Sequence, residues 1–76
     1  MKPFNLEKAK AGNPVCTIRG EPVRIVCFDR KCKNYPILAL IDRSGFEVIA
    51  DYTSSGYFYY SYSEYRSSPN DLMMVE

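Results

Sequence analysis

Three cysteines are the residues of this sequence with the most versatile chemistry, because a thiol can act as a nucleophile, a metal ligand or half of a disulfide. They stand at positions 16, 27 and 32 of a 76-residue chain that contains no histidine. The odd number argues against a disulfide framework, and a Ser-His-Asp or Cys-His centre cannot form without histidine. A four-ligand zinc site would need a carboxylate or a second subunit. We therefore predict no metal and no cofactor.

The surroundings of the three cysteines differ. Cys16 and Cys27 lie in apolar stretches, and we expect them to be small fillers inside strands. Cys32 lies in a basic segment, where positive charge favours the reactive thiolate. We expect Cys32 in an exposed turn and predict that it reacts first of the three thiols.

Four acidic residues are candidates for general acid or base chemistry: Asp29, Asp42, Glu47 and Asp51. Each lies at the end of an expected strand or at an outward position within one, and their spacing brings no two of them into one pocket. A chain of this length also offers little concave volume for a substrate. Residues 53–56, which read TSSG, match no phosphate-binding loop. The sequence therefore predicts a protein that is not an enzyme.

Basic residues are concentrated in the first part of the sequence. Residues 1–41 contain eight Lys or Arg and three Asp or Glu, a net charge of +5, whereas residues 42–76 contain two and six, a net charge of −4. Phosphate groups could bind to a basic stripe made of Arg19, Arg24, Arg30, Lys31 and Lys33. The same residues would also serve as solvated edges and loops that prevent strand pairing between chains. We favour this second interpretation, because a nucleic-acid-binding domain is usually far more basic than the net charge of +1 found here.

Six of the seven tyrosines fall between residues 52 and 65. A strand over 57–62 would divide this cluster between two faces, so some of its rings must stay exposed. Exposed tyrosines offer rigid contact area with a polar tip, which suits a protein interface. The candidates are Tyr57, Tyr59, Tyr60, Tyr62 and Tyr65. Filling a sheet face by cross-strand pairing is an equally good interpretation, and base stacking ranks third, because only Arg66 lies nearby to meet a phosphate.

A short helix is expected over residues 5–11. Asn5 is a suitable N-cap, and Glu7 lies in the first turn, where the helix dipole favours an acidic side chain. Gly12 suits the position after the last turn, and Pro14 prevents continuation. About two turns of helix are not stable alone, so this segment must pack on the rest of the fold.

Stretches with a period of two residues follow the helix, separated by turn residues at intervals of about ten. Strands are expected over 15–18, 23–28, 37–41, 46–52 and 57–62. The third strand is wholly apolar, which predicts either a central strand covered on both faces or a strongly bent barrel strand. Together the strands predict an antiparallel β-meander over residues 15–62.

Alternation within two of these strands predicts which side chains face the core. In the strand over 46–52 the inward residues are Phe46, Val48, Ala50 and Tyr52. In the strand over 23–28, one face carries Val23, Ile25 and Cys27, and the other carries Arg24, Val26 and Phe28.

The predicted fold class is mainly β, or α+β by strict count, in a single domain over residues 1–76. A short N-terminal helix packs on a five-stranded, twisted antiparallel meander or a small open barrel of the SH3-like or OB-like kind. Residues 63–76 are expected to be a polar tail, in which 72–75 either pair as a final strand or cap the core. No apolar run reaches the ~18 to 20 residues of a membrane span, and no signal-peptide core is visible. We therefore expect a cytoplasmic protein without a membrane partner.

Four stretches spread over nearly the whole chain read KPFNLEKAKAGNPVCT at residues 2–17, VRIVCFD at 23–29, YPI at 35–37 and DLMM at 71–74. They resemble a group of small bacterial proteins that are common in gut anaerobes and in phage- or mobile-element-like gene neighbourhoods. This resemblance implies no established activity. Similar sequences carry a shorter turn, rich in Gly and Asp, in place of residues 30–34, and fewer aromatic residues around 57–65. Cys32 and the tyrosine cluster are therefore particular to this chain.

The function predicted from these patterns is a non-enzymatic protein-interaction or accessory module that uses the exposed tyrosines of the 57–62 strand. Its partner would be another protein or a second copy of the chain. The alternative is a nucleic-acid-binding small β-barrel that uses a basic loop, with phosphate contacts from Arg24, Arg30, Lys31 and Lys33. The salt dependence of binding distinguishes the two functions, because phosphate-driven binding weakens steeply as the salt concentration rises and tyrosine-driven binding barely responds.

Overall fold

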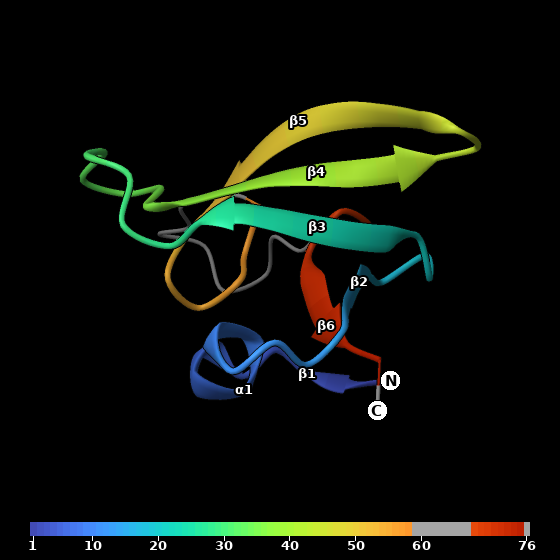
Figure 1. Ribbon diagram of the computed structural model, residues 1–76, viewed down its shortest axis with the longest axis horizontal. Helices are drawn as coiled ribbons and strands as arrows, with labels where there is room; N and C mark the ends of the chain where they lie inside the picture. Colours follow the sequence, from blue (N-terminus) through green and yellow to red (C-terminus); the bar gives the residue numbers. More distant parts are fainter. Residues whose placement is uncertain (59–67, 76) are drawn as a thin grey trace.

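The structure, a computed structural model, describes residues 1–58 and 68–75. It contains one curled six-stranded sheet and a short helix, so the predicted mainly β fold of the small open-barrel type is confirmed. The elements are β1 (Lys2–Pro3), α1 (Leu6–Lys10), β2 (Val15–Thr17), β3 (Pro22–Cys27), β4 (Ile37–Arg43), β5 (Phe46–Tyr52) and β6 (Leu72–Met74). In Figure 1 the strands β3, β4 and β5 form the upper part of the molecule, above β2, β6, β1 and α1.

The predicted helix is present as α1. The Asn5 side chain caps it, because its Oδ1 accepts a hydrogen bond from the Lys8 N–H at 3.0 Å. The helix packs through the buried Ala9, and Leu6 lies against the edge of the core. Within the described residues, no helix is long and apolar enough to cross a membrane.

Four consecutive strands, β2 to β5, form an antiparallel meander as predicted. The turn between β4 and β5 consists of Ser44 and Gly45, which both have a positive φ, of 57° and 90°. A two-residue turn of this kind matches the right-handed twist of the flanking strands, and glycine adopts a positive φ without steric cost. Ile37 is still opposite Tyr52 at the far end of this hairpin, so the two strands pair along their whole length.

The two remaining strands extend the sheet beyond the meander. β6 lies between β1 and β2, and its Met74 is opposite both Lys2 and Val15. Of the two roles expected for residues 72–75, the structure therefore shows the paired final strand. Among the described residues the sheet has six strands, whereas five were expected. Both ends of the described chain lie at the β1–β6 pair (Figure 1).

The core lies on the inner face of the curled sheet. β4 contributes Ile37, Ala39 and Ile41, which are almost completely buried. Ala50 and Tyr52 of β5 are buried beside them, as predicted. On the other face of β4, Leu38 and Leu40 are only half-buried, so of the two expected roles this strand does not have that of a strand covered on both faces.

The prediction for Phe46 was wrong. It was expected to face the core but is 75% exposed. Phe46 is the first residue of β5 after the hairpin turn, so it lies at the tip of the hairpin, beyond the part of the sheet that the core covers. Alternation alone does not show where the core ends.

A β-bulge in β3 changes which of its residues face the core. The register moves from Ile25 opposite Ala39 to Cys27 opposite Leu38, so β3 contains one extra residue between these pairs. Cys27 consequently lies with Leu38 on the outer face, while Phe28 packs against the core. The faces predicted for Cys27 and Phe28 were therefore wrong, because the expected alternation assumed an uninterrupted strand.

Candidate interaction surface

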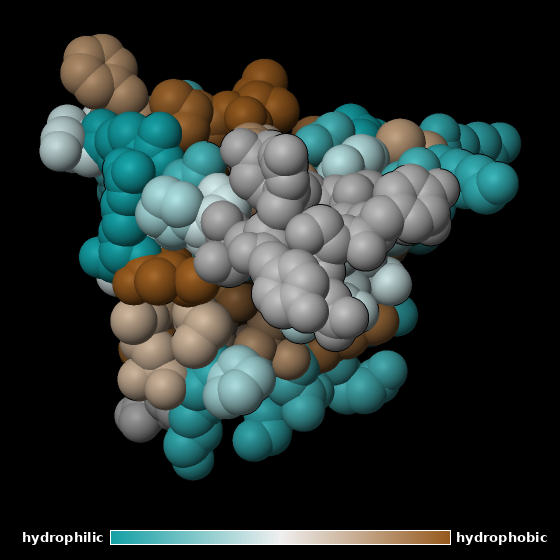
Figure 2. Space-filling model, turned by 180° about the vertical axis from the view of Figure 1, so that it is seen from behind, coloured by the Kyte–Doolittle hydropathy of each residue, from teal (hydrophilic) through white to brown (hydrophobic). Residues whose placement is uncertain are grey.

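The outer face of β3, β4 and β5 carries adjoining apolar side chains, which we call the outer strip. β4 contributes Leu38 and Leu40, β5 contributes Ile49, and the bulged part of β3 contributes Val26 and Cys27. Ile49 is 76% exposed and Val26 is 56% exposed, although both lie within paired strands. Seen from behind, hydrophobic atoms gather along the top of the molecule (Figure 2), where Figure 1 places β5. An exposed apolar group of this kind is typical of an interaction site.

Strand register determines how the outer strip is arranged. Leu40 is opposite Ile49 on β5, and Leu38 is opposite Cys27 on β3, so apolar side chains adjoin on all three strands. Opposed residues on antiparallel strands have Cβ atoms about 4.5–5.5 Å apart. The strip is therefore continuous across the three strands.

An ion pair closes the outer strip at the hairpin end. Arg24 Nη2 donates to Glu47 Oε1 at 2.8 Å, and its Nε donates to Oε2 at 2.9 Å, which makes a bidentate contact. The arginine belongs to β3 and the glutamate to β5, so the pair passes over β4. The hydrogen bond from Arg24 lowers the pKa of the Glu47 carboxyl, despite the opposing effect of partial desolvation.

A second ion pair closes the opposite end. Arg30, in the loop after β3, donates from Nη2 to Asp51 Oδ2 at 2.7 Å and to the Tyr35 carbonyl oxygen at 3.0 Å. The backbone N–H of Arg30 also donates to the Pro36 carbonyl oxygen at 2.9 Å, which holds this loop beside the start of β4. At both ends the cation thus comes from the β3 side and the anion from β5.

The far edge of β5 is unpaired by any described strand. Backbone groups of an antiparallel pair alternate between the partner strand and the opposite side. Phe46 and Arg43 flank a two-residue turn and therefore form a hydrogen-bonded pair. It follows that the N–H and C=O groups of Glu47, Ile49 and Asp51 point to the free edge, beside the outer strip.

The four residues predicted to contact nucleic acid do not form one cluster. Arg24 and Arg30 lie near opposite ends of β3, and each already pairs with a carboxylate of β5. Lys31 and Lys33 are exposed in the loop after β3, and within the described chain neither takes part in an ion pair. Two of the four predicted phosphate contacts therefore have anionic partners within the protein.

The predicted tyrosine surface lies mostly outside the described residues. That is the case for Tyr59, Tyr60, Tyr62 and Tyr65. Tyr57 is described and 54% exposed, and it follows the turn over residues 53–56 that the sequence predicted. The expected aromatic strand does not begin at Tyr57, which has no strand conformation.

Asp71 is a buried residue that sequence reasoning did not select. Its Oδ1 accepts a hydrogen bond from the Phe58 N–H at 2.7 Å, and its Oδ2 accepts one from the Ser68 N–H at 3.1 Å. One carboxylate therefore joins the two positions at which the described chain stops and resumes. The available signal was the turn sequence Pro69-Asn70 before it, since Asp in such a turn often accepts bonds from nearby backbone N–H groups.

A second polar network joins the β4–β5 hairpin to the turn after β2. Arg43 donates to Glu21 Oε2 at 2.8 Å and to Asn70 Oδ1 at 2.8 Å, and the Thr17 hydroxyl donates to Glu21 Oε1 at 3.1 Å. The hydrogen bond from Arg43 lowers the pKa of the Glu21 carboxyl. Burial raises the pKa of Tyr52, whose hydroxyl donates to the Asn70 carbonyl oxygen at 2.8 Å. These groups satisfy one another, so the network holds the fold together.

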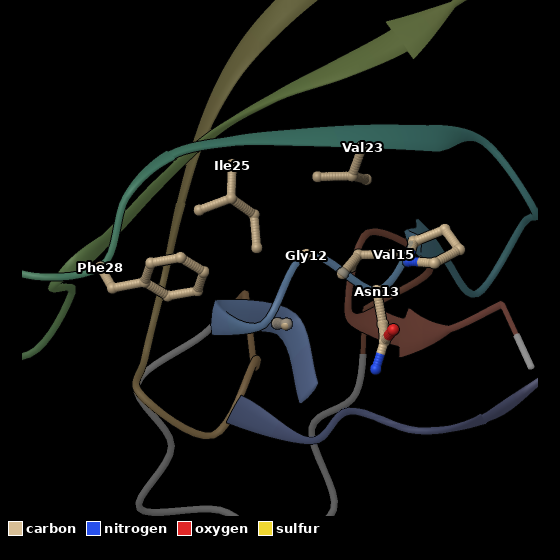
Figure 3. A pocket seen from close by; sticks show the side chains of 8 residues that line it. Gly12, Asn13, Val15, Val23, Ile25 and Phe28 are labelled. Atoms are coloured by element: carbon tan, nitrogen blue, oxygen red, sulfur yellow. The ribbon is translucent and has the colours of Figure 1, made fainter. Parts of the chain in front are cut away.

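An apolar cavity of about 240 Å³ lies between the chain after α1 and β3. Val23 and Ile25 of β3 extend into it, as does Phe28 directly after β3, and Asn13 lies on the facing side (Figure 3). No ionisable side chain is found among the described residues that line it. The cavity thus lacks the converging acid, base or nucleophile of an active site.

The three cysteines are free thiols in different surroundings. Cys16 is 4% exposed, burial raises its pKa, and its Sγ lies 3.3 Å from Met1 Sδ. It therefore fills space inside a strand, as expected. Cys27 and Cys32 are half-buried, Cys27 on the outer strip and Cys32 in the loop after β3. In the described part of the chain no three His, Cys, Asp or Glu side chains are grouped as metal ligands.

Comparison with known proteins gives one family. A family model described as Haemophilus phage HP1 protein YO09 matches residues 1–68. No curated protein and no solved structure matches the chain. The phage part of the resemblance seen in the sequence is thereby confirmed, whereas nothing supports the association with gut anaerobes. Since the matched residues cover most of the chain, this protein belongs to the family of Haemophilus phage HP1 protein YO09.

Proposed function

We propose that this protein is a non-enzymatic interaction module of a phage or mobile element, and that it binds a protein partner through the outer strip. The observation that carries the proposal is the 76% exposure of Ile49 on the outer face, beside Leu40. A folded sheet gains stability when such side chains are covered, so an apolar outer face is a site where a partner would be stabilised. In the cytoplasm, where we place the protein, that partner would be a phage or host protein.

Charge supports a protein partner over nucleic acid. The ends of the outer strip carry Glu47 and Asp51 together with Arg24 and Arg30. A phosphate backbone would be repelled by the two carboxylates and would have to displace them from the arginines. A protein surface can instead cover the apolar centre and complement both signs at the rim.

The tyrosine candidates remain part of this proposal as a second contact region. Tyr57, at 54% exposure, would provide the rigid contact area with a polar tip that protein interfaces favour. Tyr59, Tyr60, Tyr62 and Tyr65 are proposed to contribute in the same way. We also propose an SH3-like or OB-like arrangement, which rests on the curled antiparallel meander of β2 to β5.

The test is site-specific photo-crosslinking with benzoylphenylalanine in an extract of phage-infected cells. Position 49 probes the outer strip, and position 10, the exposed Lys10 of α1, is the matched control. We expect a discrete protein adduct from position 49, lost when Leu40→Asp is added, and none from position 10. Identical adducts from both positions would contradict the proposal. So would tight, salt-sensitive binding of a single-stranded or double-stranded DNA probe that Lys31→Ala with Lys33→Ala abolishes.

A further inference from the structure

The charges that flank the outer strip have a consistent polarity. Both cations, Arg24 and Arg30, come from the β3 side, and both anions, Glu47 and Asp51, come from β5. Each ion pair therefore has its cation on the β3 side of β4 and its anion on the β5 side. A surface with this pattern is complementary to itself when one copy is turned over.

A two-fold axis that runs parallel to β4 between two facing sheets produces this match. Such an axis keeps each position along the strands and exchanges left with right, so β3 of one copy lies over β5 of the other. Arg24 of each copy then faces Glu47 of the other, and Arg30 faces Asp51. An axis perpendicular to the strands instead places β3 over β3, with arginine over arginine and carboxylate over carboxylate. Charge therefore selects one of the two symmetric packings.

The apolar residues fit the same arrangement. Leu38, Leu40 and, at the hairpin end, the exposed Asp42 lie on the outer face of β4, the middle strand of the three, so each would meet its own copy near the two-fold axis. The single like-charge contact of Asp42 stands against four opposite-charge contacts of the two arginines. Two sheets packed face to face with nearly aligned strands are separated by about 10 Å, which two facing leucine side chains fill. The two apolar centres would cover each other while the charged sides pair at the rim.

We propose that the outer strip binds a second copy of this chain, as a face-to-face dimer with its two-fold axis parallel to β4. This inference rests on the proposed function, since it names the partner of the same surface. The strip is about two strand spacings, roughly 10 Å, wide. Over the length of the seven-residue β5, about 23 Å, it covers about 230 Å², well below the ~800 Å² that each partner contributes to a stable interface. The dimer is therefore reversible and depends on concentration.

Sedimentation equilibrium tests the dimer over a concentration range from about 10 µM to about 1 mM. The wild-type protein is expected to move from the 8.8 kDa monomer mass towards twice that mass. Each reversal, Arg24→Glu or Glu47→Arg, turns two symmetry-related attractions into repulsions and should weaken self-association about tenfold or more. Both side chains are partly exposed, so the variants should fold, and far-UV circular dichroism verifies this.

The decisive measurement mixes the two single variants. In a mixed dimer the glutamate introduced at position 24 of one chain faces the arginine introduced at position 47 of the other. The unchanged Glu47 and Arg24 face each other at the symmetry-related contact, so association is expected to recover to near the wild-type level. The double variant, with both reversals in one chain, should also associate.

The control mixture combines Arg24→Glu with Glu7→Arg. The second variant has the same net charge as Glu47→Arg, but its substitution lies on the exposed surface of α1, away from the outer strip. It offers no new partner to the glutamate introduced at position 24. This control mixture should therefore associate clearly more weakly than the mixture of the two reversals.

Two results would overturn the dimer. One is a wild-type protein that stays monomeric throughout the concentration range, and the other is a variant mixture that associates no better than its control. Either result leaves the proposed function standing if position 49 still crosslinks to a different protein. Loss of that crosslink together with a monomeric wild type would refute both.

Discussion

Asp71 provides the sharpest test of how this fold is held together. Its carboxylate accepts one hydrogen bond from the Phe58 N–H at 2.7 Å and another from the Ser68 N–H at 3.1 Å, in a residue that is 5% exposed. Asp71→Asn keeps the size of the side chain but replaces one acceptor oxygen by an NH₂ group, which faces a backbone N–H. One bond to a charged acceptor is lost, at a cost of about 1.5–3 kcal/mol.

That cost is a large part of the total stability. A chain of this length has a free energy of unfolding of about 4–11 kcal/mol, at 0.05–0.15 kcal/mol per residue. With a urea dependence of about 1 kcal/mol per molar, the unfolding midpoint should fall by about 1.5–3 M. Because the chain has no tryptophan, far-UV circular dichroism is the suitable signal.

The matched control is Asp29→Asn. Asp29 is exposed, and its side chain accepts no hydrogen bond from the described residues. The control removes the same charge, so its free energy of unfolding should stay within about 0.5 kcal/mol of the wild type. If Asp71→Asn unfolds at the same urea concentration as Asp29→Asn, the carboxylate does not hold residues 58 and 68 together, and the reasoning is wrong.

Three further predictions concern other parts of the molecule. The hydrogen bond from Arg43 lowers the pKa of Glu21 in the folded state, so its stabilisation of the fold is present above the usual pKa of Glu and is lost as pH falls through the folded-state value. The difference in urea midpoint between wild type and Glu21→Gln should therefore be largest near pH 7 and shrink towards about pH 3. A difference that stays constant with pH would contradict this prediction. Gly56→Ala should destabilise the protein by at least about 1–2 kcal/mol, because φ is +86° and the new Cβ would lie 2.7 Å from side-chain atoms of Phe4. In a double-mutant cycle with Phe4→Ala, the changes in the free energy of unfolding should not be additive. If the two changes simply add, the clash with Phe4 is not the cause. Cys16, at 4% exposure and with a raised pKa, should react most slowly of the three thiols with a maleimide in the native state and no faster than unfolding permits, as mass spectrometry of the labelled peptides would measure.

Local features of this fold were predictable from the sequence. Asn5 as an N-cap, the turn at Ser44 and Gly45, and the apolar run of β4 each depend on residues close together in the chain. The pairing of β6 with β1 and β2 was not, because Met74 meets Lys2 and Val15 across nearly the whole sequence and no local pattern encodes that contact. Pairing between strands so far apart in the sequence depends on how the whole chain packs.

The candidate site was predictable to a smaller extent. Glu47 and Ile49 are outward positions in the alternation of the 46–52 strand, but their juxtaposition with Arg24 depends on the β3–β4–β5 register. The bulge that turns Cys27 outward and Phe28 inward leaves no mark in the sequence pattern. Composition makes the tyrosines and the basic loop conspicuous, whereas the apolar face between two ion pairs exists only once the strands are aligned.

The position of β6 also has a consequence for the order of events during synthesis. β1 pairs with β6 alone among the described strands, and β2 has β6 on one of its two sides. In a nascent chain that ends before residue 72, β1 therefore has no partner strand, and β2 is unpaired on the side where β6 belongs. This holds even when the meander of β2 to β5 is already complete. Closure of the sheet waits until β6 has left the ribosome, and the slowest step of folding should be the pairing of β6 with β1 and β2.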